Sequence, residues 1–351
     1  MNQRTLFPLA AALLLSACSP PDAPPSATVT LMTFNVENLF DTADDPGKDD
    51  ETYLPLAAKQ TDAHVEKCAP IPVDRWREDC LALDWSDAVL EHKLSVIAET
   101  IRQIPGGPDI IALQEVEHAA LLERLRAGPL ADLGYGPAIL IEGQDRRGID
   151  VGFLSRLPLA GEAVLHPLEF PEHPDRQPDT RGVLEATFVL PDGGLLTGFA
   201  VHFPAPFHPT DMRVRAYEHL NALRRALPDD RHAFAAGDFN TTSREAAETG
   251  LLERLVRPDW TVAHETGCAD CPGTQYYARD DSWSFLDMIL WSPPRSKNAT
   301  WAIRADSARL ANLLPAQKTA EGTPRRYDAA SLSGVSDHWP LAVEIQSTQK
   351  Q

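Results

Sequence analysis

Apolar strand segments recur along this chain, and many of them run directly into a polar residue. In HAFAAGDFN, residues 232–240, small and apolar residues end at Asp238 and Asn240. Alternating or continuous apolar runs of this kind are typical of half-buried and buried strands. The others are TVTLMTFNVENLF, DIIALQEV, GIDVGFLSR, VLEATFVL, LLTGFAVHF, FLDMILWS and HWPLAVEI. The fold must therefore be built largely from sheets.

Helical repeats separate several of these strands. Apolar residues recur at helical spacing in HKLSVIAETIRQI, AALLERLRAGPLADL, DMRVRAYEHLNALRRAL and REAAETGLLERL. Residues 191–194, Pro-Asp-Gly-Gly, lie between two strands and indicate a hairpin turn. Helices that alternate with strands, mixed with direct hairpins, predict an α/β sandwich with helices outside two sheets.

The chain is long enough to bury a large core. It has 351 residues, of which 43% are hydrophobic, and no second domain boundary is evident. We expect one folded domain over residues 29–346. Residues 41–86 interrupt its pattern, because they are polar, show little periodicity and contain two cysteines. We interpret them as a decorated loop or insertion.

The N-terminus has the features of an export signal. Residues 6–15 form an apolar run that is too short to span a bilayer but suits the core of a signal peptide. Residues 15–18, Leu-Ser-Ala-Cys, resemble the lipobox of bacterial lipoproteins. We predict a signal peptide over residues 1–17, lipidation of Cys18 and a flexible Pro-rich tether over residues 18–28. The protein would then be anchored in the bacterial cell envelope, on the periplasmic or outer-membrane face, or secreted if an ordinary signal operates instead.

Four cysteines remain when Cys18 carries lipid. An even number suits an oxidising compartment, in which disulfides persist. The simplest pairing is Cys68–Cys80 and Cys268–Cys271. His264 beside the second pair offers a partial zinc site as an alternative, but no fourth ligand is evident nearby.

The chain is strongly acidic, with a net charge of −19. Residues 1–17 carry one arginine and no acidic residue, so the mature chain carries about −20. Such a surface disfavours the binding of polyanions through its overall field. A phosphate-bearing substrate must therefore be held locally, by a few basic groups or by a bound cation.

Polar side chains at the strand ends form a chemically coherent set. They are Asn35, Glu115, Asp150, His202, Asp238, Asn240, Asp287, Asp337 and His338. Each alone has a structural explanation, such as a turn cap or a hydrogen-bonded core histidine. Together they are harder to explain in this way, because buried carboxylates must be paired, protonated or bound to a metal. Carboxylate and amide oxygens suit Mg²⁺, and histidines beside carboxylates transfer protons near neutral pH.

The motifs that carry these residues resemble a known family. In order they are TFNVENLFD, ALQEVE, DRRGIDVGFLSR, AVHFP, GDFN, WSFLDMIL and SDHWP. They are similar to motifs of the endonuclease/exonuclease/phosphatase superfamily, which includes deoxyribonuclease I and sphingomyelinases. The resemblance spans about residues 29–346. It implies a deoxyribonuclease I-like four-layer α/β sandwich, with two mixed, mainly antiparallel sheets flanked by helices, and metal-dependent hydrolysis of phosphate esters.

The resemblance also implies roles for individual residues. Asn35 and Glu115 match metal-binding positions, with Asp337 as a further contributor. The expected cofactor is Mg²⁺, with Mn²⁺ or Ca²⁺ as alternatives. Asp238 and Asn240 match the pair that positions the attacking water and holds the phosphate. The other assignments are His338 as the histidine of the last motif, Asp287 as its orienting aspartate, His202 as general acid or phosphate ligand, Asp150 as partner of His202, and Arg181 as a phosphate contact.

Two further segments could contact a substrate. The helix expected over residues 211–227 carries Arg213, Arg215, Arg224 and Arg225. We expect the last two to lie on a solvated face with ordinary ion pairs. Residues 273–287 carry Tyr276, Tyr277 and Trp283. These aromatic rings could stack on nucleobases or, equally, pack under the neighbouring cysteine pair.

Three functions are compatible with these features. The first is a surface-anchored or periplasmic nuclease, and the second is a phosphatase or phosphodiesterase acting on a phospholipid head group or a small phosphate ester. The third is a non-catalytic binding module, which the intact acidic and histidine residues argue against. Long hydrophobic hairpins suited to membrane lipids are not evident. We therefore expect a nuclease with nucleic acid as its substrate, membrane contact through the lipid anchor alone, and infer no protein partner.

Overall fold

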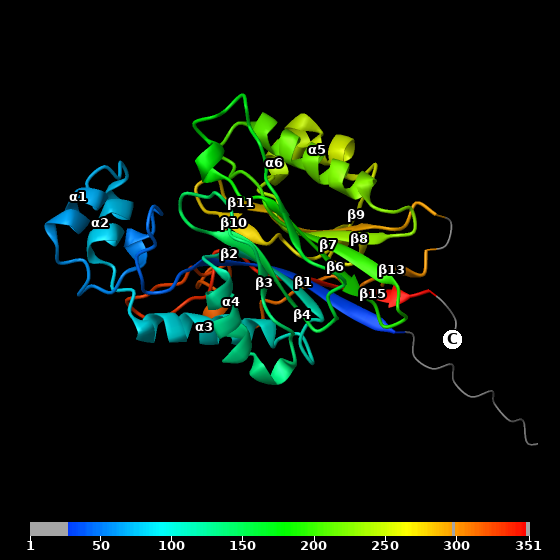
Figure 1. Ribbon diagram of the computed structural model, residues 1–351, viewed down its shortest axis with the longest axis horizontal. Helices are drawn as coiled ribbons and strands as arrows, with labels where there is room; N and C mark the ends of the chain where they lie inside the picture. The colour runs from blue at the N-terminus through cyan, green and yellow to red at the C-terminus, as the bar shows by residue number, and fades with distance from the viewer. Residues whose placement is uncertain (1–26, 297–298, 349–351) are drawn as a thin grey trace, which may run out of the picture.

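The computed structural model describes residues 27–296 and 299–348, and two large sheets dominate it (Figure 1). The first contains β1 (Thr28–Leu39), β2 (Ile110–Val116), β3 (Ile139–Leu140), β4 (Asp150–Ser155), β13 (Trp301–Ile303), β14 (Arg309–Leu310) and β15 (Leu341–Ser347). Its seven strands follow the order β13-β15-β1-β2-β4-β3, with β14 paired to β15. β1 and β2 run parallel, and the other neighbours run antiparallel.

The second sheet has the same mixed character. It contains β5 (Val164–His166), β6 (Val183–Val189), β7 (Leu195–His202), β8 (His232–Asp238), β9 (Thr261–Val262) and β12 (Asp287–Ser292). Its six strands follow the order β5-β6-β7-β8-β12-β9, and β7 and β8 run parallel. A small ribbon pairs β10 (Gln275–Tyr277) with β11 (Ser282–Ser284). Two mixed, mainly antiparallel sheets are therefore confirmed.

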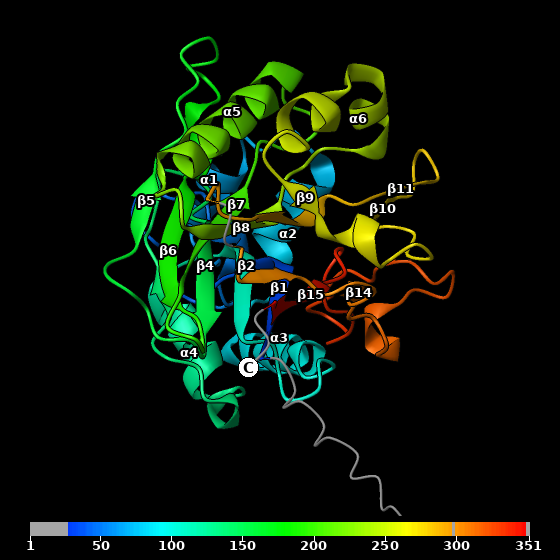
Figure 2. The ribbon, with the colours of Figure 1, turned by 90° about the vertical axis from the view of Figure 1, so that its right-hand side faces the viewer.

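Helices cover the outer faces of both sheets, which gives four layers (Figures 1 and 2). α3 (Asp87–Ile101) and α4 (Ala119–Ala127) pack apolar side chains on the first sheet. α5 (Thr210–Ala226) does so on the second sheet, and α6 (Ser243–Thr249) lies beside it. Between the sheets, Phe153, Phe188 and Phe234 belong to one buried cluster with edge-to-face ring contacts. The sandwich is held by these three apolar layers.

The boundaries of some elements differ from those that the sequence predicts. α3 begins at Asp87, five residues before the predicted helix over 92–104. The helix predicted over 119–133 ends as α4 at Ala127, because Gly128 and Pro129 follow and Pro disfavours continuation. The last strand begins at Leu341 rather than His338, so His338 lies in the turn before it.

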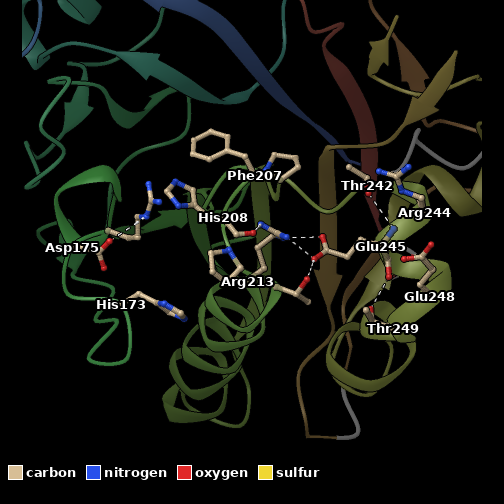
Figure 3. Close-up of a pocket in the computed structure, with 14 residues that line it drawn as sticks. His173, Asp175, Phe207, His208, Arg213, Thr242, Arg244, Glu245, Glu248 and Thr249 are labelled. Atoms are coloured by element: carbon tan, nitrogen blue, oxygen red, sulfur yellow. Dashed lines mark hydrogen bonds and ion pairs between the residues drawn. The ribbon is translucent and has the colours of Figure 1, made fainter. Parts of the chain in front are cut away.

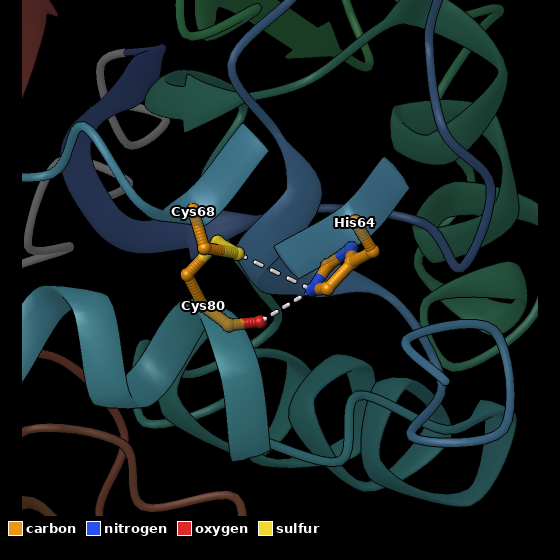
Figure 4. A group of neighbouring side chains, drawn as sticks. All are labelled: His64, Cys68 and Cys80. Atoms are coloured by element: carbon orange, nitrogen blue, oxygen red, sulfur yellow. Dashed lines mark hydrogen bonds between the residues drawn. A yellow bond between two sulfur atoms is a disulfide. The ribbon is translucent and has the colours of Figure 1, made fainter. Parts of the chain in front are cut away.

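The insertion over residues 41–86 is more regular than its sequence indicates. It contains α1 (Asp62–Cys68) and α2 (Asp74–Ala82), which lie outside the four layers (Figure 1). A disulfide joins Cys68 to Cys80, and the Nε2 atom of the buried His64 lies 2.8 Å from the Cys80 carbonyl oxygen (Figure 4). Cys268 and Cys271 form the second disulfide, so their thiols are not free to bind zinc. Both connectivities match the predicted pairs.

The predicted signal peptide and Cys18 lie outside the described residues, as does the tether up to residue 26. β1 begins at Thr28 and β15 ends at Ser347, so the folded part extends one residue beyond each predicted limit. Within residues 27–296 and 299–348, no helix is long and apolar enough to cross a membrane.

Candidate active site

The strand register brings three predicted residues into one row. Asp238, at the end of β8, lies opposite His202 on β7 and opposite Asp287 on β12. β1 and β2 are also parallel, so their C-terminal parts lie side by side, and Asn35 pairs with Gln114 there. The Nδ2 atom of Asn35 crosses between the sheets and donates to Asp238 Oδ2 over 3.1 Å. The two sheets therefore meet at this cluster.

Irregular backbone at the strand ends aims the side chains. Glu115 has a φ of 64°, in the left-handed region that non-glycine residues seldom adopt, and the register of β2 shifts there against both β1 and β4. Asn240, just after β8, has a φ of 51°. Such conformations cost about 1 kcal/mol or more and cluster at functional sites. Their presence at two predicted site residues is consistent with a functional role.

Glu115, Asn35 and His202 surround one side of Asp238. Asn35 Nδ2 lies 3.3 Å from Glu115 Oε1, and the other Glu115 oxygen accepts from the backbone N–H of Asn38. The Nε2 atom of His202 lies 3.6 Å from Asp238 Oδ2 and 3.9 Å from Glu115 Oε1. His202 and Asp238 are both buried. Two carboxylates and a histidine thus face one small region.

His338 and Asp287 form the other side. The Nδ1 atom of His338 lies 2.6 Å from Asp287 Oδ2, which leaves Nε2 facing Asp238 Oδ2 at 4.0 Å. The turn that carries His338 is fixed by Ser336, whose hydroxyl donates to the Asn35 carbonyl and accepts from the His338 N–H. A carboxylate that holds one ring nitrogen sets the orientation of the other.

The surroundings of His338, His202 and Asp238 shift the pKa values of these groups in different directions. Burial opposes the charged form of His338, but the carboxylates of Asp287, Asp337 and Asp238 together outweigh burial and raise the pKa of His338 well above its ordinary value. Burial, with Arg181 and Arg147 nearby, lowers the pKa of His202 well below its ordinary value. Burial also raises the pKa of Asp238 to about 7. A charged His338, a neutral His202 and a carboxyl that titrates near neutrality provide distinct chemical roles.

The donor set fits a hard divalent cation. Glu115 and Asp238 direct one oxygen each at the same Asn35 amide, and Asp337 Oδ1 lies 3.9 Å from His338 Nε2. Oxygen ligands of this kind suit Mg²⁺. The side-chain oxygen of Asn35, however, accepts from the backbone N–H of Glu37, and the other Asp337 oxygen contacts Arg326. Of the predicted metal ligands, Glu115 is the one best placed to hold the ion.

The contacts of two residues, Asp150 and Arg181, differ from the roles that the sequence predicts for them. Asp150 is not the partner of His202: it accepts from the backbone N–H of Gly143, and among the described residues no ion pair joins it to His202 within 4.0 Å. Arg181 is buried and pairs with the equally buried Asp145 at 2.8 Å. It can act on the site by its charge, but its guanidinium already has a carboxylate partner.

Sequence reasoning missed several charged residues of the site. The Glu37 carboxylate accepts from the backbone N–H groups of Tyr327 and Asp337 and contacts Arg326, which fastens the last motif to β1. Arg147 Nη2 lies 3.9 Å from Glu115 Oε2, and its side chain is 45% exposed. Glu37 lies two residues after Asn35, and Arg147 lies three residues before Asp150. Their closeness in sequence to predicted site residues is the signal that could have identified them.

The arginines of α5 all have partners within the protein. Arg213 is buried, forms a bidentate pair with Glu245 and donates to the Ala205 carbonyl, so it holds the loop after β7 against α6. Arg215 pairs with Glu172. Arg224 is buried rather than solvated, because it donates to Ser292 and Pro293 at the end of β12, whereas Arg225 forms the predicted surface ion pair.

Aromatic side chains flank the cluster on two sides. The β10–β11 ribbon bridges to His338 through Gln275. The ring centroid of Trp283 on β11 lies 5.2 Å from that of Tyr276 on β10 and 5.0 Å from that of the buried Trp339, which follows His338. On the other side a pocket of about 640 Å³ lies between the loop after His202 and residues 242–249 (Figure 3). Phe207 at this pocket is 79% exposed and lies against His208. The predicted active-site residues do not line the pocket.

Comparisons with known proteins agree with this geometry. The family model described as Endonuclease/Exonuclease/phosphatase family matches residues 32–338. A search of curated protein sequences finds no match.

Solved structures share the fold at low sequence identity. TDP2 of D. rerio, complexed with single strand DNA product, is 15% identical with a TM-score of 0.56, and the match covers 91% of this chain and 99% of that one. A Bacteroides vulgatus endonuclease/exonuclease/phosphatase is 16% identical with a TM-score of 0.54, covering 92% and 99%. One from Beutenbergia cavernae is 17% identical with a TM-score of 0.54, covering 92% and 72%. These likenesses concern the fold.

We expect Asp150→Asn to stabilise the protein more at pH 8 than at pH 5. Burial raises the pKa of Asp150 from 3.8 to about 7 in the folded protein. The contribution of Asp150 to the stability of the folded state is therefore highest below about pH 4 and falls as pH rises through about 7, because the unfolded chain releases the Asp150 proton first. Asparagine keeps an acceptor for Gly143 and carries no charge, so the gain at pH 8 should be about 1–3 kcal/mol.

Urea unfolding at both pH values measures this effect. Glu142→Gln, which changes an exposed carboxylate in the same loop, is the control and should show no such difference. An equal effect of Asp150→Asn at pH 5 and pH 8 would contradict a buried, titrating carboxyl.

Proposed function

This chain belongs to the endonuclease/exonuclease/phosphatase family, and on that premise we propose that it is a divalent-metal-dependent phosphodiesterase that cleaves nucleic acid. One observation carries the proposal. Asp238 Oδ2 accepts from Asn35 and lies within 4.0 Å of both His202 Nε2 and His338 Nε2. A buried carboxyl between a neutral and a charged histidine can take a proton from an attacking water while a charged group faces the phosphate.

Asp238 is the proposed general base. Its pKa of about 7 lies near the operating pH, where a base is most effective. Its second oxygen accepts from the backbone N–H of Asn240, which fixes the carboxylate orientation. One hydrogen of the Asn240 side-chain amide goes to the Phe203 carbonyl, so the other is available to the substrate phosphate.

His338 and His202 take different roles in this proposal. Asp287 keeps His338 charged and directs Nε2 towards Asp238, so the imidazolium can stabilise negative charge that develops on the phosphate. His202 is neutral at physiological pH, because its pKa is lowered. We therefore favour phosphate binding over general acid catalysis for His202.

Positive charge must be concentrated at the site, because the chain as a whole is acidic. A divalent cation held at Glu115, with Asn35 and Asp337 nearby, would offset phosphate charge when bound. Arg147 is the exposed guanidinium beside Glu115, and we propose it, in place of Arg181, as the direct phosphate contact. Arg181 would contribute through its charge alone.

The aromatic residues favour nucleic acid over a small phosphate ester. Tyr276 and Trp283 are neighbouring rings on the ribbon that bridges to His338, and stacking on such rings binds bases of any sequence. The exposed Phe207, in the loop that follows β7, offers another ring. A structural neighbour, D. rerio TDP2, is described with single strand DNA product. A phosphatase or phosphodiesterase acting on small esters is the second candidate, since it would use the same catalytic groups.

We also propose that the enzyme acts in the cell envelope. The Leu-Ser-Ala-Cys sequence at residues 15–18 supports lipidation of Cys18, and the two disulfides suit an oxidising compartment. A lipid on Cys18 would tether the folded domain through residues 18–27.

Asp238→Asn and His338→Gln should each lower Mg²⁺-dependent cleavage of plasmid DNA by about 10³-fold or more. The first removes the base, and the second removes the charge that faces the phosphate. His219→Gln, on α5, is the control and should retain activity. Substantial cleavage by a folded double variant, or cleavage that persists in EDTA, would refute this site.

Trp283→Ala should raise KM for single-stranded DNA about 5- to 100-fold, because one stacked base contributes about 1–3 kcal/mol. Hydrolysis of bis(p-nitrophenyl) phosphate, which spans no row of rings, should change by less than about twofold. Trp76→Ala, which changes an exposed tryptophan on α2, is the matched control. Equal effects on both substrates would favour the small-ester alternative.

The mature N-terminus should be a diacylated Cys18, detectable by mass spectrometry of protein extracted from membranes. Cys18→Ala should move the protein to the soluble fraction. An unmodified Cys18 within an uncleaved chain would exclude the anchor.

A further inference from the structure

A second group of carboxylates lies where the insertion meets the end of β2, and the proposed phosphodiesterase mechanism does not use it. Asp45, Asp50 and Glu117 each place an oxygen within 4.8 Å of the other two. Asp45 and Asp50 belong to the insertion, and Glu117 directly follows β2. The group therefore joins two parts of the chain that are otherwise distant in sequence.

Two of these carboxylates are buried. Asp50 is 1% exposed and Glu117 is 3% exposed. One oxygen of Asp50 accepts from the Asp45 N–H, while Oδ1 has no hydrogen-bond partner among the described residues. A carboxylate oxygen that is removed from water and left unpaired is costly, so a partner is expected. Burial accordingly raises the pKa of Asp50 to about 6.

Protein cations do not supply that partner. The adjacent carboxylates Asp44 and Glu51 are neutralised by Lys67, at 3.2 and 2.8 Å. By contrast, no lysine or arginine nitrogen in the described parts of the chain forms an ion pair within 4.0 Å with Asp45, Asp50 or Glu117. Within the described residues, no lysine or arginine thus compensates the charge of this group, although Lys67 pairs with the two adjacent carboxylates.

His118 is the one basic side chain at the group, and it is not free to act as a ligand. Its Nδ1 accepts the backbone N–H of Leu121 at the start of α4, so in the neutral ring Nε2 carries the hydrogen. Nε2 lies 3.1 Å from Asp41 Oδ2 and 3.6 Å from Glu117 Oε2. His118 therefore orients carboxylates, and the available ligands are all oxygen atoms.

We propose that Asp45, Asp50 and Glu117 bind a hard divalent cation of the Ca²⁺ type. Ca²⁺ takes six to eight oxygen ligands in flexible geometry, and three carboxylates with water satisfy it without an ordered cage. The ion would neutralise Asp50 Oδ1 and link the insertion to Glu117, which lies two residues after Glu115. Its role is structural, so it is independent of whether the enzyme cleaves nucleic acid.

Thermal unfolding of the purified protein in EGTA and in millimolar Ca²⁺ tests the site. Calcium should raise the Tm of the wild type by about 3 °C or more. Asp50→Asn should lose this response, and in EGTA its Tm should equal or exceed that of the wild type, because a buried charge is gone. Asp44→Asn, next to the site but paired with Lys67, should respond like the wild type. No response in the wild type, or a full response in Asp50→Asn, would overturn the proposal.

Terbium luminescence separates this site from the active site and does not depend on the folding of Asp50→Asn. Trp85 donates to the carbonyl of Phe40, the residue before Asp41, and can sensitise Tb³⁺ bound here. Emission that Ca²⁺ displaces should persist in Glu115→Gln, which alters only the catalytic ligand. Loss of all displaceable emission in that variant would place the ion at the active site and overturn the proposal.

Discussion

The register of β8 between β7 and β12 is the constraint on which the site depends. It places Asp238 opposite His202 and Asp287, so that one row across three strands supplies three of the proposed catalytic groups. The close approach of β8 to β7 leaves no room for a side chain at Gly237, where a Cβ would lie 1.9 Å from the Val201 carbonyl oxygen. A shift by one residue would turn Asp238 to the other face of the sheet and remove the cluster.

Buried carboxyl groups are common to the active site and the insertion. The chain carries −19, and it buries carboxyls whose pKa values rise to about 6 or 7 at Asp50, Asp150, Glu37 and Asp238. The arrangement is stable where each carboxyl has a hydrogen-bond donor, a histidine or a cation. In our proposals, bound divalent cations supply the balancing positive charge at the active site and at the insertion.

Departures from regular strand geometry convert the sheet edge into a site. Glu115 and Asn240 adopt left-handed backbone at the ends of β2 and β8, and Glu37 does so within β1. Each lets a side chain leave the alternation of its strand, and Glu37 then binds the loop that carries His338. The packing of the apolar layers offsets the conformational free energy that these residues require.

The sequence alone determined the long strands, the helices on their outer faces, the family and the candidates Glu115, His202, Asp238, Asp287 and His338, because periodicity and motif order are local properties. Tertiary structure alone decided the partners. Asp150 accepts a hydrogen bond from the backbone N–H of Gly143, and Arg181 pairs with Asp145. Glu37 and Arg147 belong to the site, although the sequence analysis did not predict them. These contacts join residues up to 300 positions apart, as between Glu37 and Asp337, and depend on register and burial that no local pattern encodes.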